Sequence, residues 1–219
     1  TSDFSDMVKN GMKSIPKRFD ILVGGFPCQP FSVAGNKRGF EDKGRGGLLF
    51  EIIKVLRARK PKAVFLENVK HLEAHDDKKT FRRIWKELKN AGYDIKAKVL
   101  NSATHGNVPQ TRERIYIVGF RSARTLKKFH FPGNIPLTKT MAGVLERNVD
   151  EKYYYGDDDK FIYPKLRDAV KRRDRFYQYR RVYVRELSSG YCPTLTASMG
   201  MGGHNTPIIR DAKGIRKLT

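Results

Sequence analysis

Apolar and polar residues follow two different periods in the first half of the chain. Two short apolar runs, at residues 19–23 and 63–66, are each followed by a stretch in which apolar residues recur every three or four positions, at 48–59 and 80–91. Uninterrupted apolar runs are typical of buried strands, and the longer period is typical of amphipathic helices. Two more strands are predicted at 93–100 and 114–120, the last in a more peripheral position because its isoleucines alternate with polar or aromatic residues. This order predicts an α/β domain with a Rossmann-like, mostly parallel sheet over residues 1–123.

The pattern becomes irregular beyond residue 123. Prolines divide this part into short segments, and aromatic residues are interleaved with Lys and Arg over 165–185. We expect residues 124–219 to form a second, smaller region that is irregular or β-rich, with few regular elements. Two interpretations of its aromatic residues remain open. They stack on bases beside cations that contact phosphates, or its tyrosines cover the core of a small β-rich unit.

Charge adds a candidate partner to this picture. The 219 residues include 45 Lys and Arg against 23 Asp and Glu, which gives a net charge of +22. Such an excess favours a polyanion, above all DNA or RNA, because neutralised phosphates release their counterions. Two cysteines form no disulfide framework, so we expect an intracellular protein. No apolar run approaches membrane-spanning length, and no signal-peptide pattern opens the sequence.

Candidate chemistry lies in four segments at or after the predicted strands. They are GGFPCQPFS (24–32), FLENV (65–69), QTRERIYIVGF (110–120) and CPTLTA (192–197). Open α/β sheets bind ligands beyond the carboxyl ends of their strands, and a Gly- and Pro-containing turn presents Cys28 outward. Alone, a cysteine is commonly a packing residue, a glutamate an ion-pair partner, and an arginine a phosphate contact. Together, Cys28, Glu67, Arg112 and Arg114 could carry out covalent chemistry on a polar planar substrate.

In combination, these motifs resemble one family, the cytosine-C5 DNA methyltransferases of the bacterial restriction–modification type. PCQ resembles its nucleophile segment, ENV its carboxylate segment, and QTRER its QxRxR segment, in the same order and at similar separations. Residues 40–52, FEDKGRGGLLFEI, are similar to the segment after the family's mobile catalytic loop. Thr-Leu at 194–195 resembles the marker of its target recognition region, and the closing RKLT resembles the start of its next segment. The resemblance covers nearly the whole chain.

The resemblance implies a class I methyltransferase fold and methyl transfer from S-adenosylmethionine to C5 of cytosine in double-stranded DNA. Cys28 would attack C6 of the base, which makes C5 nucleophilic. Glu67 would protonate or hydrogen-bond N3, and Arg114, supported by Arg112, would contact O2. Because C6 is inaccessible in a stacked duplex, the cytosine must be flipped out. A prokaryotic cytoplasm is the expected location.

Further site residues are assigned by the same resemblance. S-adenosylmethionine is expected to contact Phe26, Pro27 and Leu48. Residues 32–47 resemble the loop that closes over DNA. The expected DNA contacts are Gln29, Ser32, Lys37, Arg38, Arg45, Thr194 and Leu195. No metal site is predicted.

Two family features are not visible in the sequence. One is the Gly-rich turn of a first βαβ unit, which holds the methyl donor, and the other is the final helical segment. We therefore expect a fragment, or else one subunit of a split enzyme whose complementary chain supplies the cofactor-binding unit. A remnant that binds DNA without methylating it is a further alternative. A thiol hydrolase is disfavoured, because no pattern in the sequence links Cys28 to any of the five histidines. The histidines are expected at the surface or in turns. Cys192 is expected to be a packing residue.

Overall fold

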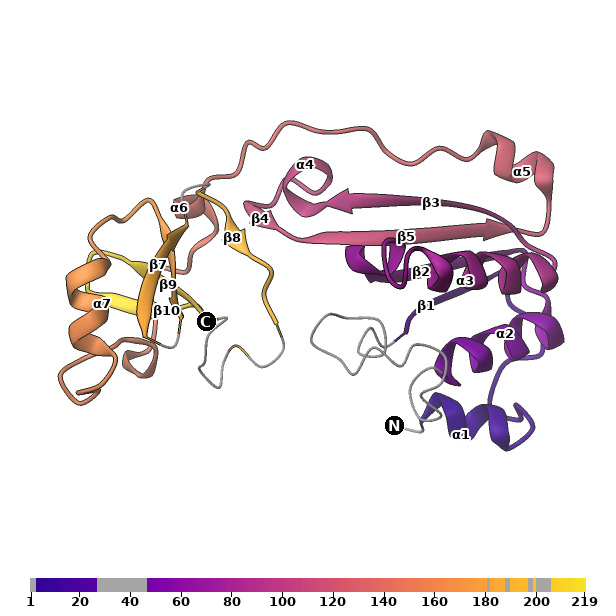
Figure 1. The fold of residues 1–219 in the computed structure, drawn as a ribbon, viewed down its shortest axis with the longest axis horizontal. Coiled ribbons are helices and arrows are strands. Elements are labelled where there is room, and N and C mark those ends of the chain that lie inside the picture. The colour runs from indigo at the N-terminus through magenta and orange to yellow at the C-terminus, as the bar shows by residue number, and fades with distance from the viewer. Residues whose placement is uncertain (1–2, 27–46, 181, 188–189, 197–198, 200–205) are drawn as a thin grey trace. The chain divides into compact units, whose positions relative to one another are not determined.

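The computed structural model describes residues 3–26, 47–180, 182–187, 190–196, 199 and 206–219. The chain divides into two compact units, which Figure 1 shows as two groups of elements. The first comprises residues 1–100 and 113–132, and the second comprises 101–112 and 133–219. This division differs from the predicted boundary at residue 123 in two respects. Residues 124–132 belong to the first unit, and residues 101–112 belong to the second.

The first unit is built on a four-stranded sheet with the order β1-β2-β5-β3. Its strands are β1 (Ile21–Gly25), β2 (Ala63–Val69), β5 (Glu113–Phe120) and β3 (Asp94–Asn101). Strand β1 is parallel to β2, β5 is antiparallel to β2, and Figure 1 shows β3 and β5 running in opposite directions. The predicted α/β class is confirmed, and the sheet is mixed, with β1 and β2 as its parallel pair.

Strand β5 lies in the interior of this sheet, between β2 and β3. The prediction of a peripheral position for it was wrong, because four of its eight residues are buried, among them Val118 and Gly119 in addition to the alternating isoleucines. Gly119 lies opposite Val64, and a Cβ atom on it would come within 2.8 Å of the Val64 side chain and 2.9 Å of Ile95. The glycine therefore allows β-branched side chains to pack on both sides of it.

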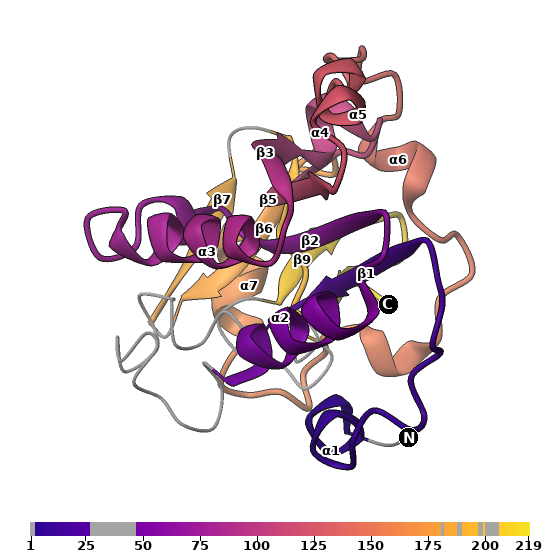
Figure 2. The ribbon, with the colours of Figure 1, turned by 90° about the vertical axis from the view of Figure 1, so that its right-hand side faces the viewer.

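Two amphipathic helices cover one face of this sheet, as Figures 1 and 2 show. They are α2 (Gly47–Arg59) and α3 (Lys79–Asn90), and both confirm predicted helices within two residues. Leu56 of α2 and Ile84 and Leu88 of α3 are fully buried against Val64 of β2. The short helix α1 (Phe4–Lys9) packs on the other side of α2 through Val8 and Val55. A 3-10 helix, η3 (Lys70–Glu73), follows β2.

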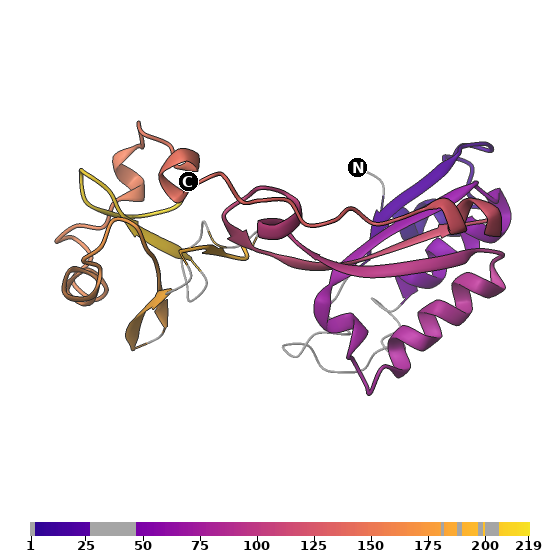
Figure 3. The ribbon, with the colours of Figure 1, turned by 90° about the horizontal axis from the view of Figure 1, so that it is seen from above.

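The opposite face of the sheet is covered only in part among the described residues. Helix α5 (Ala123–Lys128) lies over the end of β5, and the chain after it continues along β3, as Figure 3 shows. The Phe120 and Phe129 rings are 5.7 Å apart, and Lys96 Nζ donates a hydrogen bond to the Phe129 carbonyl at 2.7 Å. Strand β1 has no such cover on this face, where Val23 is 68% exposed.

The second unit contains more regular structure than we predicted. An antiparallel sheet has the order β10-β9-β6-β7, and a two-stranded parallel ladder joins β4 to β8. The expectation of a β-rich region is confirmed, whereas the expectation of few regular elements was wrong. The elements are α4 (Ser102–His105), β4 (Gln110–Thr111), α6 (Met141–Val144), η4 (Glu151–Tyr153), α7 (Tyr163–Ala169), β6 (Phe176–Arg180), β7 (Tyr183–Leu187), β8 (Cys192–Pro193), β9 (Pro207–Arg210) and β10 (Ile215–Lys217).

The aromatic residues of this unit divide between its core and its surface. Phe176 and Tyr177 are each only 1% exposed and pack in two apolar clusters, one of which includes Leu166 of α7. For these two residues, the interpretation that the aromatic side chains cover the core of a small β-rich unit is confirmed. Tyr183, by contrast, is 57% exposed and remains available for an external contact.

Candidate active site and nucleic-acid interface

Glu67 and Arg114, two of the predicted site residues, form an ion pair in the first unit. Glu67 lies near the carboxyl end of β2, and Arg114 lies near the amino end of β5, opposite Val69. Because these strands are antiparallel, those two ends are neighbours. Arg114 Nε lies 2.9 Å from Glu67 Oε1, and the two side chains are 16% and 34% exposed. The sheet therefore holds a carboxylate and a guanidinium side by side at one edge, partly open to solvent.

The carboxyl end of β1 lies beside the same carboxylate. Gly25, the last residue of β1, is the register partner of Glu67 in the parallel β1–β2 pair. A Cβ atom on Gly25 would lie 3.5 Å from Glu67 Oε2, so the lack of a side chain leaves the space next to this oxygen open. Cys28, the predicted nucleophile, follows three residues after Gly25 in the sequence, outside the described residues.

Asn68 links the ends of β1 and β2, a role that the sequence analysis did not assign. Its side chain is buried, with the residue only 2% exposed. Nδ2 donates a hydrogen bond to the Phe26 carbonyl oxygen at 3.2 Å, and Oδ1 accepts one from the Val69 N–H at 2.8 Å. Buried amides need such partners. In the sequence, the only sign of this role was a polar amide next to Glu67 in an otherwise apolar strand. In the structure, Asn68 fixes the backbone where the chain leaves β1.

The predicted contacts with S-adenosylmethionine differ in the surface they expose. Phe26 is 6% exposed and belongs to the apolar core under the sheet, so it offers a ligand little area. Leu48, in the first turn of α2, is half-buried and packs against the same cluster. Seven predicted site residues lie outside the described part of the chain: Pro27, Cys28, Gln29, Ser32, Lys37, Arg38 and Arg45.

The QTRER segment is divided between the two units after Arg112. Gln110, Thr111 and Arg112 belong to the second unit, whereas Glu113 and Arg114 belong to the first. The Thr194 hydroxyl donates a hydrogen bond to the Thr111 carbonyl at 2.8 Å, next to the β4–β8 ladder. Leu195 packs against an apolar cluster of the second unit. Both residues of the Thr-Leu marker therefore help to hold the second unit together.

Cys192 is a packing residue, as the sequence predicted. It is 6% exposed among Met141, Phe176 and Ile209. Burial raises the pKa of its thiol to about 12, and a hydrogen bond from the Gln110 side chain opposes this effect only in part. His75 lies in a turn, as expected, but it is buried there, with 6% exposed and Nδ1 2.7 Å from the Thr80 hydroxyl.

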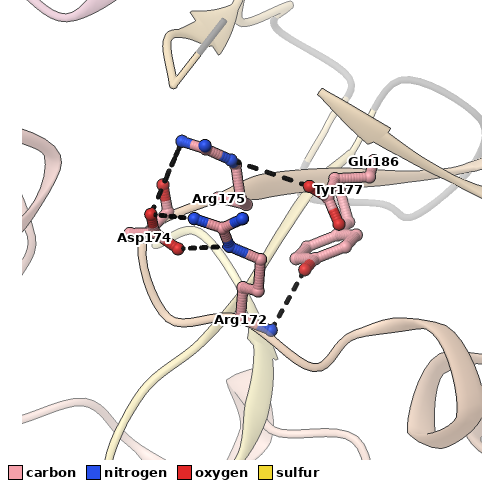
Figure 4. Close-up of polar contacts among 5 residues, drawn as sticks. All are labelled: Arg172, Asp174, Arg175, Tyr177 and Glu186. Atoms are coloured by element: carbon pink, nitrogen blue, oxygen red, sulfur yellow. Dashed lines mark hydrogen bonds and ion pairs between the residues drawn. The ribbon is translucent and has the colours of Figure 1, made fainter. Parts of the chain in front are cut away.

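Part of the positive charge in the 165–185 run is neutralised by neighbouring acids. Arg172 forms two hydrogen bonds to the Asp174 carboxylate, at 2.9 and 2.7 Å, and Arg175 lies 3.5 Å from Asp174 and 3.6 Å from Glu186 (Figure 4). The hydrogen bond from Arg172 lowers the Asp174 pKa to about 2. The Arg172 backbone N–H also donates to the Tyr177 hydroxyl at 3.1 Å. These arginines therefore hold the loop before β6 in addition to any external contact.

The second unit also contains a charged pocket of about 770 Å³. Arg147, Arg173 and Lys213 contribute cations to its lining. Its wall includes Arg216, which is 1% exposed and donates from Nε to Asp211 Oδ2 at 2.6 Å. Arginine is rarely buried without a partner, and here Asp211 provides the opposite charge. No sequence pattern indicated this pair, since its two members are an ordinary turn aspartate and an arginine in a short strand.

Within the described residues, we find no helix whose length and apolar character would let it cross a bilayer.

Comparison with solved structures defines the fold class. The chain is similar over its whole length to a methyltransferase of S. pombe, Dnmt2, with a TM-score of 0.62, 16% identity and 68% of that chain covered. It is also similar to the methyltransferase EhMeth of Entamoeba histolytica, with a TM-score of 0.52, 18% identity, and 76% of this chain and 49% of that chain covered. The fold is therefore that of the class I methyltransferases.

The family follows from sequence. A model of the C-5 cytosine-specific DNA methylases matches residues 1–215, and the chain belongs to this family. It is 49% identical to the Type II methyltransferase M.Bsp6I of Bacillus sp. (strain RFL6) over 92% of this chain and 64% of that protein. It is 37% identical to M1.ScrFI of Lactococcus lactis subsp. cremoris over 98% of this chain and 54% of that protein. The chain thus spans between half and two thirds of the length of these two relatives.

Proposed function

We propose that this chain provides the catalytic residues and the target recognition region of a DNA (cytosine-5-)methyltransferase of the restriction–modification type. Its substrate would be double-stranded DNA, and its methyl donor S-adenosylmethionine. Family membership and the Type II methyltransferases among its relatives support this assignment. A chromosomal DNA substrate in a prokaryote implies action in the cytoplasm.

The Glu67–Arg114 pair is the observation that carries the proposal. A cytosine ring has a basic nitrogen, N3, next to a carbonyl oxygen, O2, so its recognition requires a carboxyl group and a donor side by side. Glu67 and Arg114 lie 2.9 Å apart at the carboxyl end of β2, and β1 ends beside them, three residues before Cys28. This supports a site in which these three side chains act on one extruded base.

The reaction begins with the addition of the Cys28 thiolate to C6 of the base. The new S–C6 bond breaks the C5–C6 double bond, and its electron pair moves into the ring, where a proton from Glu67 at N3 and hydrogen bonds from Arg114 at O2 prevent the accumulation of charge. C5 is then enamine-like and would take the methyl group of a bound donor, whose sulfur would keep the electron pair of the broken sulfur–carbon bond and leave as a neutral thioether. Loss of the C5 proton to a base and return of the N3 proton to the Glu67 carboxylate then expel the thiolate from C6 and restore the aromatic ring.

S-adenosylmethionine, when bound, supplies a methyl group on a positively charged sulfur. Among the described residues, Leu48 is the predicted contact that retains exposed surface, because Phe26 lies in the core. The residues described therefore fit only part of a donor site. DNA contact would come from the basic residues of the second unit, including those that line the 770 Å³ pocket.

The first addition step can be tested without a methyl donor. Once the thiolate has added to C6, C5 accepts a proton from water, so the original C5 hydrogen is lost when the thiolate leaves. We would incubate the chain with genomic DNA containing [5-³H]cytosine and measure tritium released to water. Cys192→Ala serves as the matched control, because Cys192 is a packing residue of the other unit.

We expect tritium release by the wild type and by Cys192→Ala, and at least a hundredfold less by Cys28→Ser. Equal release by Cys28→Ser would eliminate Cys28 as the nucleophile. No release by the wild type would contradict the proposed chemistry and leave a DNA-binding remnant.

A further inference from the structure

The 770 Å³ pocket of the second unit has a floor built from a closed set of hydrogen bonds. Arg216 donates from Nε to Asp211 Oδ2 at 2.6 Å, and the Tyr154 hydroxyl donates to the same oxygen at 2.9 Å. The other carboxylate oxygen, Oδ1, accepts from the backbone N–H groups of Lys213 and Gly214 at 2.9 and 3.0 Å. Asp211 therefore neutralises Arg216, and this pair gives the pocket shape without net charge.

Arginine side chains also hold the two segments that form the walls. Arg216 Nη2 donates to the Glu146 carbonyl at 3.2 Å, which fixes the loop after α6 immediately before Arg147. Arg210 Nη1 donates to the Val170 carbonyl at 3.2 Å, which fixes the chain between α7 and β6. The fold thus brings these two segments to one cavity, although they are more than twenty residues apart in the sequence.

Each wall carries an arginine whose charge is available to a ligand. Arg147 and Arg173 line the pocket and are exposed, and neither forms an ion pair with any residue that the structure describes. Arg172 and Arg175, on either side of Arg173, are turned toward Asp174 instead (Figure 4). Two guanidinium groups suit a phosphate, because each can bind its oxygens through parallel hydrogen bonds.

The pocket is larger than a bare phosphate ion requires. Pockets that bind small organic molecules have volumes of about 300–1,000 Å³, and this one lies within that range. Ala142, Leu145 and Val149 add apolar side chains to the lining, and Tyr154 adds an aromatic ring. Five cationic side chains against three carboxylates leave an excess of two positive charges. The lining therefore suits an anion that carries a bulky, partly apolar group.

We propose that this pocket binds a nucleoside monophosphate, with the phosphate at Arg147 and Arg173 and the nucleoside at the apolar part of the lining. A phosphate monoester has a second pKa of about 6, so at neutral pH its charge approaches −2 and matches the excess of the pocket. Internal phosphates of DNA are diesters and carry a single charge. Two sources provide the monoester: a free nucleotide, and the 5′-phosphorylated end of a DNA strand. The second source rests on the proposed function.

Binding of adenosine 5′-monophosphate without DNA is the direct test, measured by calorimetry at pH 7.5. Adenosine and inorganic phosphate probe the two halves of the ligand separately. Arg147→Gln and Arg173→Gln each remove one of the two charges and keep most of the side-chain length. Arg124→Gln is the matched control, since Arg124 is an exposed arginine of α5 in the first unit.

We expect one bound nucleotide per chain, with a Kd at least tenfold lower than that of adenosine or of inorganic phosphate. Arg147→Gln and Arg173→Gln should each raise this Kd at least fivefold, and Arg124→Gln should leave it unchanged. Absence of saturable binding, or equal weakening by Arg124→Gln, would overturn the inference. Inorganic phosphate that binds as tightly as the nucleotide would overturn the nucleoside part of it.

Competition identifies the source of the monoester. A short duplex with 5′-phosphates that displaces the nucleotide better than the same duplex with 5′-hydroxyl ends would assign the pocket to DNA ends. Equal displacement by the two duplexes, or none, would assign it to a free nucleotide.

Failure of this inference can be distinguished from failure of the proposed function. The release of tritium from C5 requires Cys28 and DNA, whereas binding of adenosine 5′-monophosphate requires neither. Nucleotide binding without tritium release would retain the pocket and reject the chemistry. Release without nucleotide binding would do the reverse.

Discussion

Asn68 Nδ2 donates a hydrogen bond to the carbonyl oxygen of Phe26, 3.2 Å away, and thereby joins the end of β2 to the residue that follows β1. Asn68 directly follows Glu67, and Phe26 lies two residues before Cys28. One side chain therefore connects the segment that carries the proposed acid to the segment that carries the proposed nucleophile. A small shift of either backbone would change the distance between the reacting groups, and rates depend steeply on such distances.

Loss of this hydrogen bond should reduce the rate of the Cys28 step. Asn68→Asp replaces the donor by a carboxylate facing a carbonyl oxygen, and we expect tritium release to fall at least tenfold while DNA affinity changes less than twofold. Asn90→Asp, an exposed change of the same kind at the end of α3, is the control. If Asn68→Asp weakened DNA binding by the same factor as it reduced tritium release, the variant would have a general structural defect, and Asn68 would have no positioning role.

Glu67→Gln should abolish most of the activity without unfolding the protein. The amide keeps the shape of the side chain but cannot deliver a proton to N3, and removal of a general acid commonly costs about 10² to 10⁴ in rate. Circular dichroism would check the fold, and tritium release the activity. Glu73→Gln, at an exposed position in η3, is the control and should retain the wild-type rate. A Glu67→Gln rate within threefold of wild type would exclude Glu67 as the acid.

Cys192 should resist alkylation in the folded protein. A thiol whose pKa is raised to about 12 is almost entirely protonated at pH 8, and only the thiolate reacts. We expect iodoacetamide at pH 8 to leave the Cys192 peptide unmodified, as measured by mass spectrometry, and to modify it fully in concentrated guanidinium chloride. Rapid modification of the folded chain would show that the β4–β8 region opens easily.

The Asp211–Arg216 pair should make the second unit sensitive to acid. Burial by itself would raise the pKa of Asp211, but hydrogen bonds from Arg216, the Gly214 N–H and Tyr154 outweigh it and hold the pKa below its usual value. A lowered carboxyl pKa contributes stability that is fully present above the unfolded value of about 3.9 and is lost as the pH falls through the folded value.

Asp211→Asn should therefore lower the free energy of unfolding by roughly 2 kcal/mol at pH 7 and by much less below pH 3. Chemical denaturation at both pH values would measure the difference. Asp168→Asn is the control, because the Asp168 side chain is 75% exposed and lies 3.8 Å from Arg167 at the surface. If Asp211→Asn lowered the free energy of unfolding by the same amount at both pH values, the ion pair would make no contribution to stability.

The first unit was predictable because its elements have long, regular patterns. Helices α2 and α3 and strands β2 and β3 each bury one apolar run or face, and those runs are visible in the sequence. The apolar run of β1 is also visible, but Ile21 and Val23 within it are exposed, so its predicted burial was wrong. The position of β5 was not predictable from its isoleucines alone, since Gly119 shows its importance only through the side chains beside it.

The second unit was harder to predict because its strands are short and its core is partly polar. Strand β10 has three residues, and its central one is Arg216, a residue type that sequence patterns place at the surface. Its burial depends on Asp211 and on the Glu146 carbonyl, 70 positions away. Glu67 and Arg114 were assigned from their motifs, whereas Asn68 gained its role only when the Phe26 carbonyl was located in space.

The path of the chain between its units limits how two related chains could exchange their second units through recombination. The chain leaves the first unit after residue 100, returns at 113 and leaves again after 132. After a single crossover at residue 132, β4 would come from one parent and β8 from the other. The Thr194–Thr111 hydrogen bond would then join residues from two different proteins. Viable hybrids should therefore take residues 101–112 and 133–219 from the same parent.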